Sequence, residues 1–78
     1  MNMKPKFDYD DIVRVRGNAP EEARPGERAW IVGVFLTRPK GDYFNKFPEG
    51  VVYSVEFEDG SSIEIHEANL DLDNSGVE

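Results

Sequence analysis

His66 is the only histidine of the chain, so it is the first residue to consider for acid–base chemistry. It stands beside Glu67 at the end of a segment with strand-like alternation, and a lone imidazole expected to be exposed is usually a surface residue. The chain has no cysteine, and its serines lack a second histidine or a nucleophile-elbow motif. The sequence therefore predicts a protein that is not an enzyme.

Carboxylates are the other groups that could do chemistry, because several lie close together in the second half of the chain. Glu58 and Asp59 are adjacent, and Asp71 and Asp73 alternate, but no apolar context predicts the raised pKa that a glycosidase pair needs. Asp71, Asp73 and Asn74 offer alternating oxygen ligands for Ca²⁺. The turn glycine and the bidentate glutamate of an EF-hand do not follow them. We expect no metal and no cofactor.

Charge is distributed unevenly along the chain, which has a formal net charge of −7. All nine lysines and arginines lie within residues 1–46, whereas residues 47–78 carry nine acids and no lysine or arginine. An acidic surface built from the second half would attract basic proteins and repel nucleic acid and anionic lipid. A solvated face that promotes solubility is the alternative.

The length of 78 residues limits the chain to one small domain without a deep active site. Hydrophobic residues make up 38% of it, which is enough for a folded core. Short stretches alternate apolar and polar residues with the period of half-buried strands, and almost nothing favours an α-helix. The expected strands cover residues 12–16, 29–36, 51–58, 61–66 and 70–73.

This pattern predicts an all-β fold, a small SH3-like barrel of about five antiparallel strands in residues 1–73. A 3₁₀ turn over residues 66–70 is expected before the last strand, because this segment is too short for a stable α-helix. Residues 74–78 are expected to form a frayed tail. No apolar run is long enough for a membrane span, and no signal-peptide pattern begins the chain, so we expect a cytoplasmic protein.

The alternation of inward and outward residues predicts the length of the loop between the third and fourth expected strands. A two-residue loop, Asp59–Gly60, would place inward residues opposite outward ones, which a half-buried sheet does not tolerate. A three-residue loop over residues 58–60 instead sets Val55 opposite Ile63. The sequence therefore predicts a type I turn followed by a G1 bulge, with Gly60 at positive φ.

The run of residues 29–36 is the most apolar of the chain and predicts a central strand buried on both faces. Gly33 would let this strand bend and serve two sheets of a barrel. Trp30 is buried if it faces inward with Val32, and displayed if Ile31 faces inward instead. Burial is favoured, because the only tryptophan of a small domain is rarely left out of its core.

A long connection over residues 37–50 carries aromatic residues beside Lys40 and Lys46. It exceeds the length of a usual hairpin loop, and long loops are often functional. Aromatic rings beside cations are typical of interface hot spots. The alternative is a loop folded over the open end of the barrel with its rings as a cover. These aromatic residues are Tyr43, Phe44 and Phe47.

Four groups of residues share their layout with a known family. They are Phe7-x-x-x-Asp11-Ile12-Val13-Arg14-Val15, Gly26-x-x-Ala29-x-Ile31-Val32-Gly33, Tyr53-x-Val55-x-Phe57-x-Asp59-Gly60 and Glu67-x-Asn69-Leu70. In this layout, over residues 7–72, the chain resembles the immunity protein 31 family, small SH3-like proteins of bacterial polymorphic toxin systems. The resemblance implies a protein that neutralises a cognate toxin by direct contact. It identifies no toxin and no site residues.

The leading hypothesis is an immunity protein whose acidic surface meets a basic toxin domain such as a nuclease. The alternative is an acidic SH3-like adaptor or antirepressor that mimics nucleic acid and occupies a DNA-binding protein, and a third hypothesis is a subunit of an enzyme complex. We expect a basic protein partner, no nucleic acid, no membrane and a monomer when free. The predicted partner-binding residues are Tyr43, Phe44, Phe47, Glu56, Glu58, Asp59, Glu64, Glu67, Asp71 and Asp73.

Overall fold

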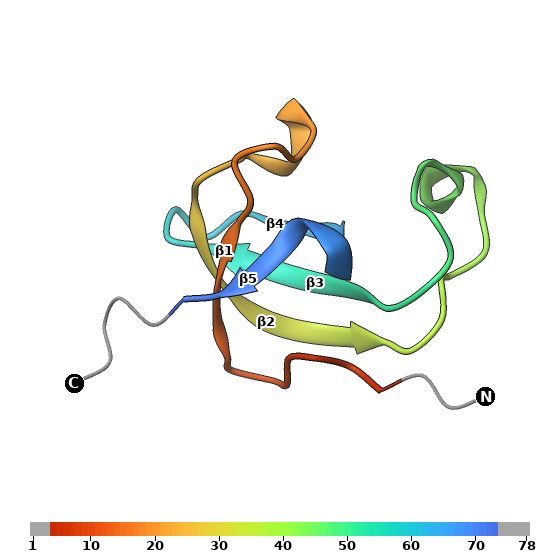
Figure 1. The fold of residues 1–78 in the computed structure, drawn as a ribbon, viewed down its shortest axis with the longest axis horizontal. Helices are drawn as coiled ribbons and strands as arrows, with labels where there is room; N and C mark the ends of the chain where they lie inside the picture. Colours follow the sequence, from red (N-terminus) through yellow and green to blue (C-terminus); the bar gives the residue numbers. More distant parts are fainter. Residues whose placement is uncertain (1–3, 74–78) are drawn as a thin grey trace.

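The alternation of apolar and polar residues produces five strands, which pair into one antiparallel sheet (Figure 1). The computed structural model describes residues 4–73, and this part of the chain contains no α-helix. The sheet has the order β4-β3-β2-β1-β5, and the predicted all-β class is confirmed. The strands are β1 (Ile12–Val15), β2 (Arg28–Phe35), β3 (Val52–Phe57), β4 (Ser62–His66) and β5 (Leu70–Leu72).

The expected closure into a barrel is wrong, because β4 and β5 are the two edges of the sheet. The 3₁₀ turn η3 (Glu67–Asn69) joins these edges, and its place before the last strand was predicted correctly. β5 is three residues long, and its ladder partners lie on β1. In the described residues β5 pairs with β1 and β4 pairs with β3 alone, so β4 keeps an open edge.

β2 is the central strand, as predicted, but only one of its faces is buried. Ala29 and Ile31 are fully buried, and Trp30 is half-buried on the opposite face. The expectation that Trp30 belongs to the core is therefore wrong. The register against β3 shifts between Ile31 and Gly33, which forms a β-bulge. A Cβ on Gly33 would lie 3.1 Å from the Cβ of Ser54, so this close approach favours glycine.

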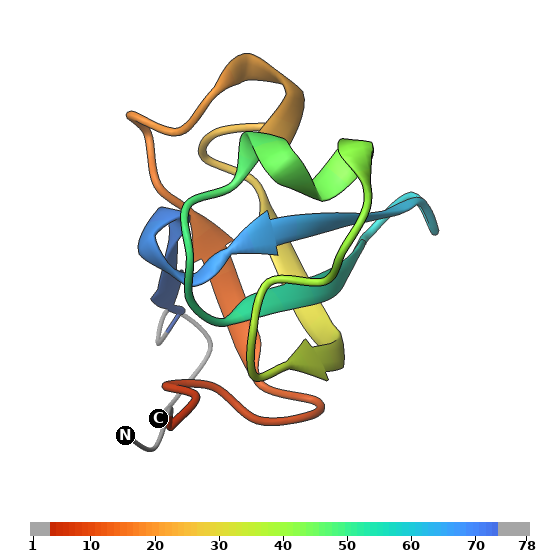
Figure 2. The same cartoon turned by 90° about the vertical axis from the view of Figure 1, so that its right-hand side faces the viewer.

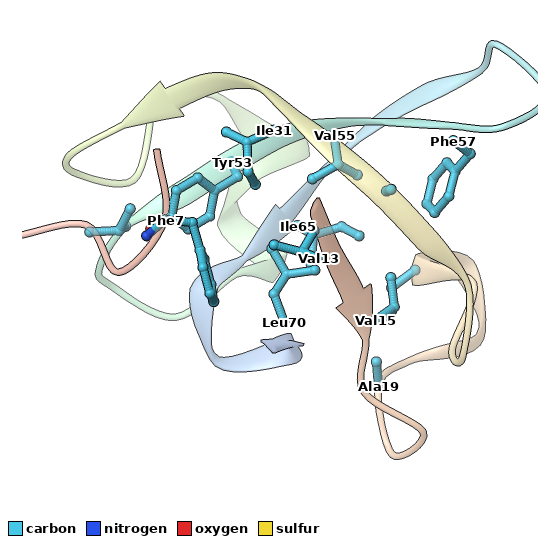
Figure 3. Packing of buried hydrophobic residues seen from close by; sticks show 13 residues of the cluster. Phe7, Val13, Val15, Ala19, Ile31, Tyr53, Val55, Phe57, Ile65 and Leu70 are labelled. Atoms are coloured by element: carbon cyan, nitrogen blue, oxygen red, sulfur yellow. The ribbon is translucent and has the colours of Figure 1, made fainter. Parts of the chain in front are cut away.

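The core fills the inner face of the curved sheet (Figure 3). Its side chains come from alternate positions of the strands, as the sequence pattern predicted. Phe7, from the segment before β1, packs against it with its ring centroid 5.4 Å from that of Tyr53. The residues that are at most 1% exposed include Val13, Val15, Tyr53, Val55, Phe57 and Ile65.

Three 3₁₀ turns are the helical segments of residues 4–73, and two of them interrupt the long connections. They are η1 (Glu21–Ala23), η2 (Asp42–Lys46) and η3. None of the helical segments in this range has the length and apolarity needed to cross a membrane. The predicted frayed tail, residues 74–78, lies outside the described residues.

The predicted hairpin between β3 and β4 is confirmed in register and in turn geometry. Val55 lies opposite Ile63. The N–H of Phe57 donates to the carbonyl of Ser61 at 2.8 Å, and the N–H of Gly60 donates back to Phe57 at 2.9 Å. Gly60 has φ of 88°, the left-handed conformation that the G1 bulge requires.

Gly60→Val is expected to lower the free energy of unfolding by about 1–2 kcal/mol, because a β-branched residue at this positive φ is strained. The measurement is urea denaturation followed by circular dichroism. Gly17→Val is the matched control, because no φ in the left-handed region and no atom within 4 Å opposes a Cβ there. Equal stability of the two variants would contradict the assigned turn.

His66 has a structural position that the sequence did not predict. Its side chain is buried, at 9% exposure, rather than exposed. Nδ1 accepts the N–H of Ala68 at 3.0 Å, which caps η3, and Nε2 lies 3.1 Å from the carbonyl oxygen of Glu49. Both ring nitrogens therefore have main-chain partners, so the imidazole connects η3 to the loop before β3.

Candidate protein-binding groove

A pocket of about 390 Å³ lies beside the open edge of β4. Residues 63–65 of β4 line its floor, residues 20–23 of the η1 segment form one wall, and η2 with the following residues forms the other. Asn69, in η3, lies at one end. Figure 2 shows both 3₁₀ turns on the side of β4 away from β3. We call this pocket the β4 groove.

Of the three aromatic residues predicted to bind a partner, Tyr43 and Phe47 line the η2 wall and Phe44 does not. Tyr43 packs edge-on against Phe44 and Phe47, at centroid distances of 4.8 and 6.1 Å. The ammonium of Lys46 lies 4.4 Å from the Tyr43 ring centroid. Tyr43 is 47% exposed, and none of the three aromatic rings belongs to the buried core. The wall therefore presents an apolar surface with one cation above it.

Local contacts hold this wall in place. Gly41, with φ of 124°, begins the turn into η2, a conformation that side chains disfavour. Arg38 donates to the carbonyl of Phe47 at 2.7 Å and forms an ion pair with Glu49 at 3.0 Å. One guanidinium thus fastens the end of the loop back to its beginning.

Glu64 connects the η2 wall to the floor of the groove. Its carboxylate accepts the Ser54 hydroxyl at 3.0 Å. Burial, followed by the hydrogen bond with Glu64, raises the pKa of Tyr43 above its ordinary value. The Tyr43 hydroxyl therefore keeps its proton to higher pH than an isolated tyrosine and remains a donor toward the Glu64 carboxylate.

The η1 wall is held from outside the groove by Arg24. This residue ends η1 in the left-handed conformation, with φ of 62°. Its guanidinium lies 4.0 Å from the centroid of the Phe57 ring and donates to Ser61 Oγ at 2.6 Å and to Asp59 at 3.1 Å. Hydrogen bonds from the Ser61 side chain, the Ser61 main chain and Arg24 lower the pKa of Asp59 to about 2. We call this set of contacts the Arg24 bridge.

The acidic residues predicted to bind a partner are divided among different parts of the surface. Glu56 lies on the exposed face of β3 opposite Trp30, and Glu64 lines the groove. Four other predicted acidic residues form ion pairs with arginines from the first half of the chain, and these pairs were not predicted from the sequence. The ion pairs are Arg28–Glu58, Arg24–Asp59, Arg16–Asp71 and Arg14–Asp73.

Glu67 has an internal role rather than a surface role. Its Oε2 accepts the Tyr53 hydroxyl at 2.6 Å and the main-chain N–H of Lys6 at 2.8 Å. The Tyr53 hydroxyl in turn accepts the N–H of Phe7 at 3.2 Å. Burial, and then the hydrogen bond to Glu67, raise the pKa of Tyr53 to about 12. These bonds attach the segment before β1 to the core.

Several groove residues were not predicted from the sequence. Pro20, Glu22 and Ala23 stand in a polar loop, and no local pattern indicates that this loop lies beside β4. Ile63 was assigned to the inner face, and there it is only partly buried against the core because β4 is an edge. An apolar residue on the inner face of β4 indicates the floor of the groove only when the order of the strands in the sheet is known.

Within residues 4–73, no group of three or more histidine, aspartate or glutamate side chains could hold a metal ion. No family model, curated protein or solved structure matches this chain. The functional argument therefore depends on the shape and chemistry of the β4 groove.

Proposed function

We propose that this chain is a small SH3-like immunity protein that binds a cognate bacterial toxin and neutralises it by direct contact. The SH3-like assignment is supported by the strand order, in which β2 is central and bulged, and by the 3₁₀ turn before β5. The resemblance of residues 7–72 to the immunity protein 31 family supports the toxin as partner.

The β4 groove is the observation that carries this proposal. It is a preformed concavity, and side chains from three separate segments converge on it. Exposed tyrosine and phenylalanine are typical of the residues that provide most of the binding energy in protein interfaces, since they bury a large area with little loss of rotamer freedom. A toxin segment seated here would cover Tyr43 and the partly buried Ile63.

Charge selects the class of toxin in this proposal. The chain has a net charge of −7, and Glu22 and Glu64 line the groove beside one cation, Lys46. A field of this sign accelerates association with a basic surface, such as the substrate cleft of a nuclease. Occlusion of that cleft would then prevent turnover by the toxin.

The nucleic-acid mimic is the weaker candidate. A mimic presents free carboxylates in a regular array, because it replaces the phosphates that a DNA-binding protein contacts. In the described part of this chain, Glu58, Asp59 and Asp71 are instead paired with arginines. These pairs reduce the negative potential where the array would have to lie.

Co-expression with the product of the adjacent upstream gene tests the proposed function. We expect that product to arrest growth, and the wild-type chain to restore growth and to bind the purified toxin domain in a stoichiometric complex. Capture of a repressor instead would support the nucleic-acid mimic. An upstream product that neither arrests growth nor binds would contradict the proposal.

Tyr43→Ala is expected to weaken toxin binding by about tenfold, because truncation of an aromatic anchor in an interface costs more than about 1 kcal/mol. Tyr9→Ala is the matched control, since Tyr9 is 57% exposed and does not line the groove. Isothermal titration calorimetry with both variants gives the comparison. Equal affinities would remove the η2 wall from the interface.

A further inference from the structure

The main-chain groups of β4 point alternately toward β3 and away from it. The N–H of Phe57 donates to Ser61 O at one end of the hairpin, and the N–H of Glu67 donates to Val51 O at the other. Because hydrogen-bonded pairs alternate along an antiparallel ladder, residues 61, 63 and 65 direct their main-chain groups to β3. Ser62 and Glu64 therefore direct theirs away from β3.

The outward main-chain groups of Ser62 and the outward carbonyl of Glu64 are available for a further strand. The main-chain N–H of Glu64 is within hydrogen-bond reach of the Tyr43 hydroxyl, so an added strand would replace that contact. β4 is an edge of the sheet. In residues 4–73, no main-chain hydrogen bond joins Ser62 or Glu64 to a turn or loop. An edge with unpaired N–H and C=O groups is a template for strand addition, which natural proteins usually block with a covering element.

The β4 groove lies along this same edge, since residues 63–65 line it. The η1 and η2 walls stand on either side rather than pairing with the strand. The groove therefore combines a strand edge without a neighbouring strand with a space of about 390 Å³ next to it. We propose that an extended segment of the protein partner adds to β4 as a sixth, edge strand. The identity of that partner as a toxin rests on the proposed function.

The side chains around β4 define the chemistry of this segment. Ile63 and Ile65 lie on the inner face of the strand, and Glu64 lies on the outer face. Successive residues of an added strand face the same two sides alternately. Apolar side chains at every second position would contact Ile63, Ala23 and Phe47, and basic side chains at the intervening positions would face Glu64. The occupant is therefore an extended segment that alternates apolar and basic residues.

A displayed library of short random peptides is the probe, and it requires no knowledge of the toxin. Selection on the wild-type chain is expected to enrich peptides with alternating apolar and basic residues. Synthetic copies of these peptides should slow the hydrogen exchange of the Ser62 amide at least tenfold when bound. Enrichment of proline-rich peptides, or unchanged exchange at the Ser62 amide, would overturn strand addition.

Ser62→Pro provides a second test, because it removes an outward N–H without removing a ladder hydrogen bond to β3. We expect this variant to bind the selected peptide about tenfold more weakly. The matched control is Leu72→Pro on the opposite edge strand, where Leu72 is 51% exposed and pairs across from Val13. Equal affinity of both variants for the peptide would contradict the proposal. Circular dichroism establishes that each variant is folded.

These outcomes separate the docking mode from the proposed function. If the peptides bind by strand addition and no toxin is neutralised, the docking mode stands and the immunity function fails. If a toxin is neutralised equally well by Ser62→Pro and by the wild-type chain, the function stands and strand addition fails.

Discussion

Phe57→Ala is expected to lower the free energy of unfolding by about 3–5 kcal/mol, the usual cost of removing a buried aromatic ring. Phe57 is 1% exposed, on the last inward position of β3. Its ring packs in the core and also carries the Arg24 guanidinium at 4.0 Å. The substitution therefore leaves a cavity and weakens the attachment of the η1 wall at the same time.

The size of this effect is large relative to the whole domain. Stabilities of roughly 0.05–0.15 kcal/mol per residue are typical, so a chain of 78 residues has about 4–12 kcal/mol in total. Phe35→Ala is the matched control, because Phe35 is 38% exposed at the end of β2. Urea denaturation should separate the two variants by at least about 2 kcal/mol. A difference near zero would contradict the placement of Phe57 in the core.

Tyr53→Phe is expected to cost about 1.5–3 kcal/mol, the range for a hydrogen bond to a charged group. The lost hydroxyl donates to Glu67 at 2.6 Å and accepts the N–H of Phe7 at 3.2 Å. Because Tyr53 is fully buried, the variant leaves partners that water reaches poorly. Tyr9→Phe, on an exposed side chain, should change stability by less than about 0.5 kcal/mol.

The pH dependence of Tyr53→Phe distinguishes this network from a simple packing effect. The folded-state pKa of Tyr53 is raised from 10.0 to about 12, so the unfolded chain loses the proton first as pH rises. The contribution of the hydroxyl is complete below pH 10.0 and is lost as pH rises through about 12. The stability gap between wild type and variant should therefore be constant at neutral pH and narrow above pH 10.0. A gap that widens there would contradict the network.

The features that the sequence predicts correctly are determined by the alternation of residues between the two faces of each strand. The alternation in β3 and β4 excludes a two-residue loop and favours a three-residue loop that sets Val55 opposite Ile63, and such a loop needs Gly60 at positive φ. The same alternation identifies Val13 and Val15 as core residues. These inferences need no knowledge of how the strands are ordered.

The features that the sequence does not predict depend on contacts between distant segments. The half-buried position of Trp30 follows from the packing of Ala29 and Ile31 into the core, which places Trp30 on the opposite face of β2. The burial of His66 follows from the loop that supplies the Glu49 carbonyl.

The ion pairs also depend on contacts between segments that are distant in the sequence. Arg14 and Asp73 meet only because β5 lies beside β1. Charge counting along the chain therefore overestimates the acidic surface. In the predicted site, the aromatic cluster of η2 was foreseen and the distribution of the carboxylates was not.

The Arg24 bridge connects one wall of the β4 groove to residues that lie outside the groove. The η1 wall is fastened to the tip of the hairpin through Asp59 and Ser61, neither of which lines the groove. Substitutions at that tip are therefore expected to loosen the η1 wall without replacing any residue that lines the groove.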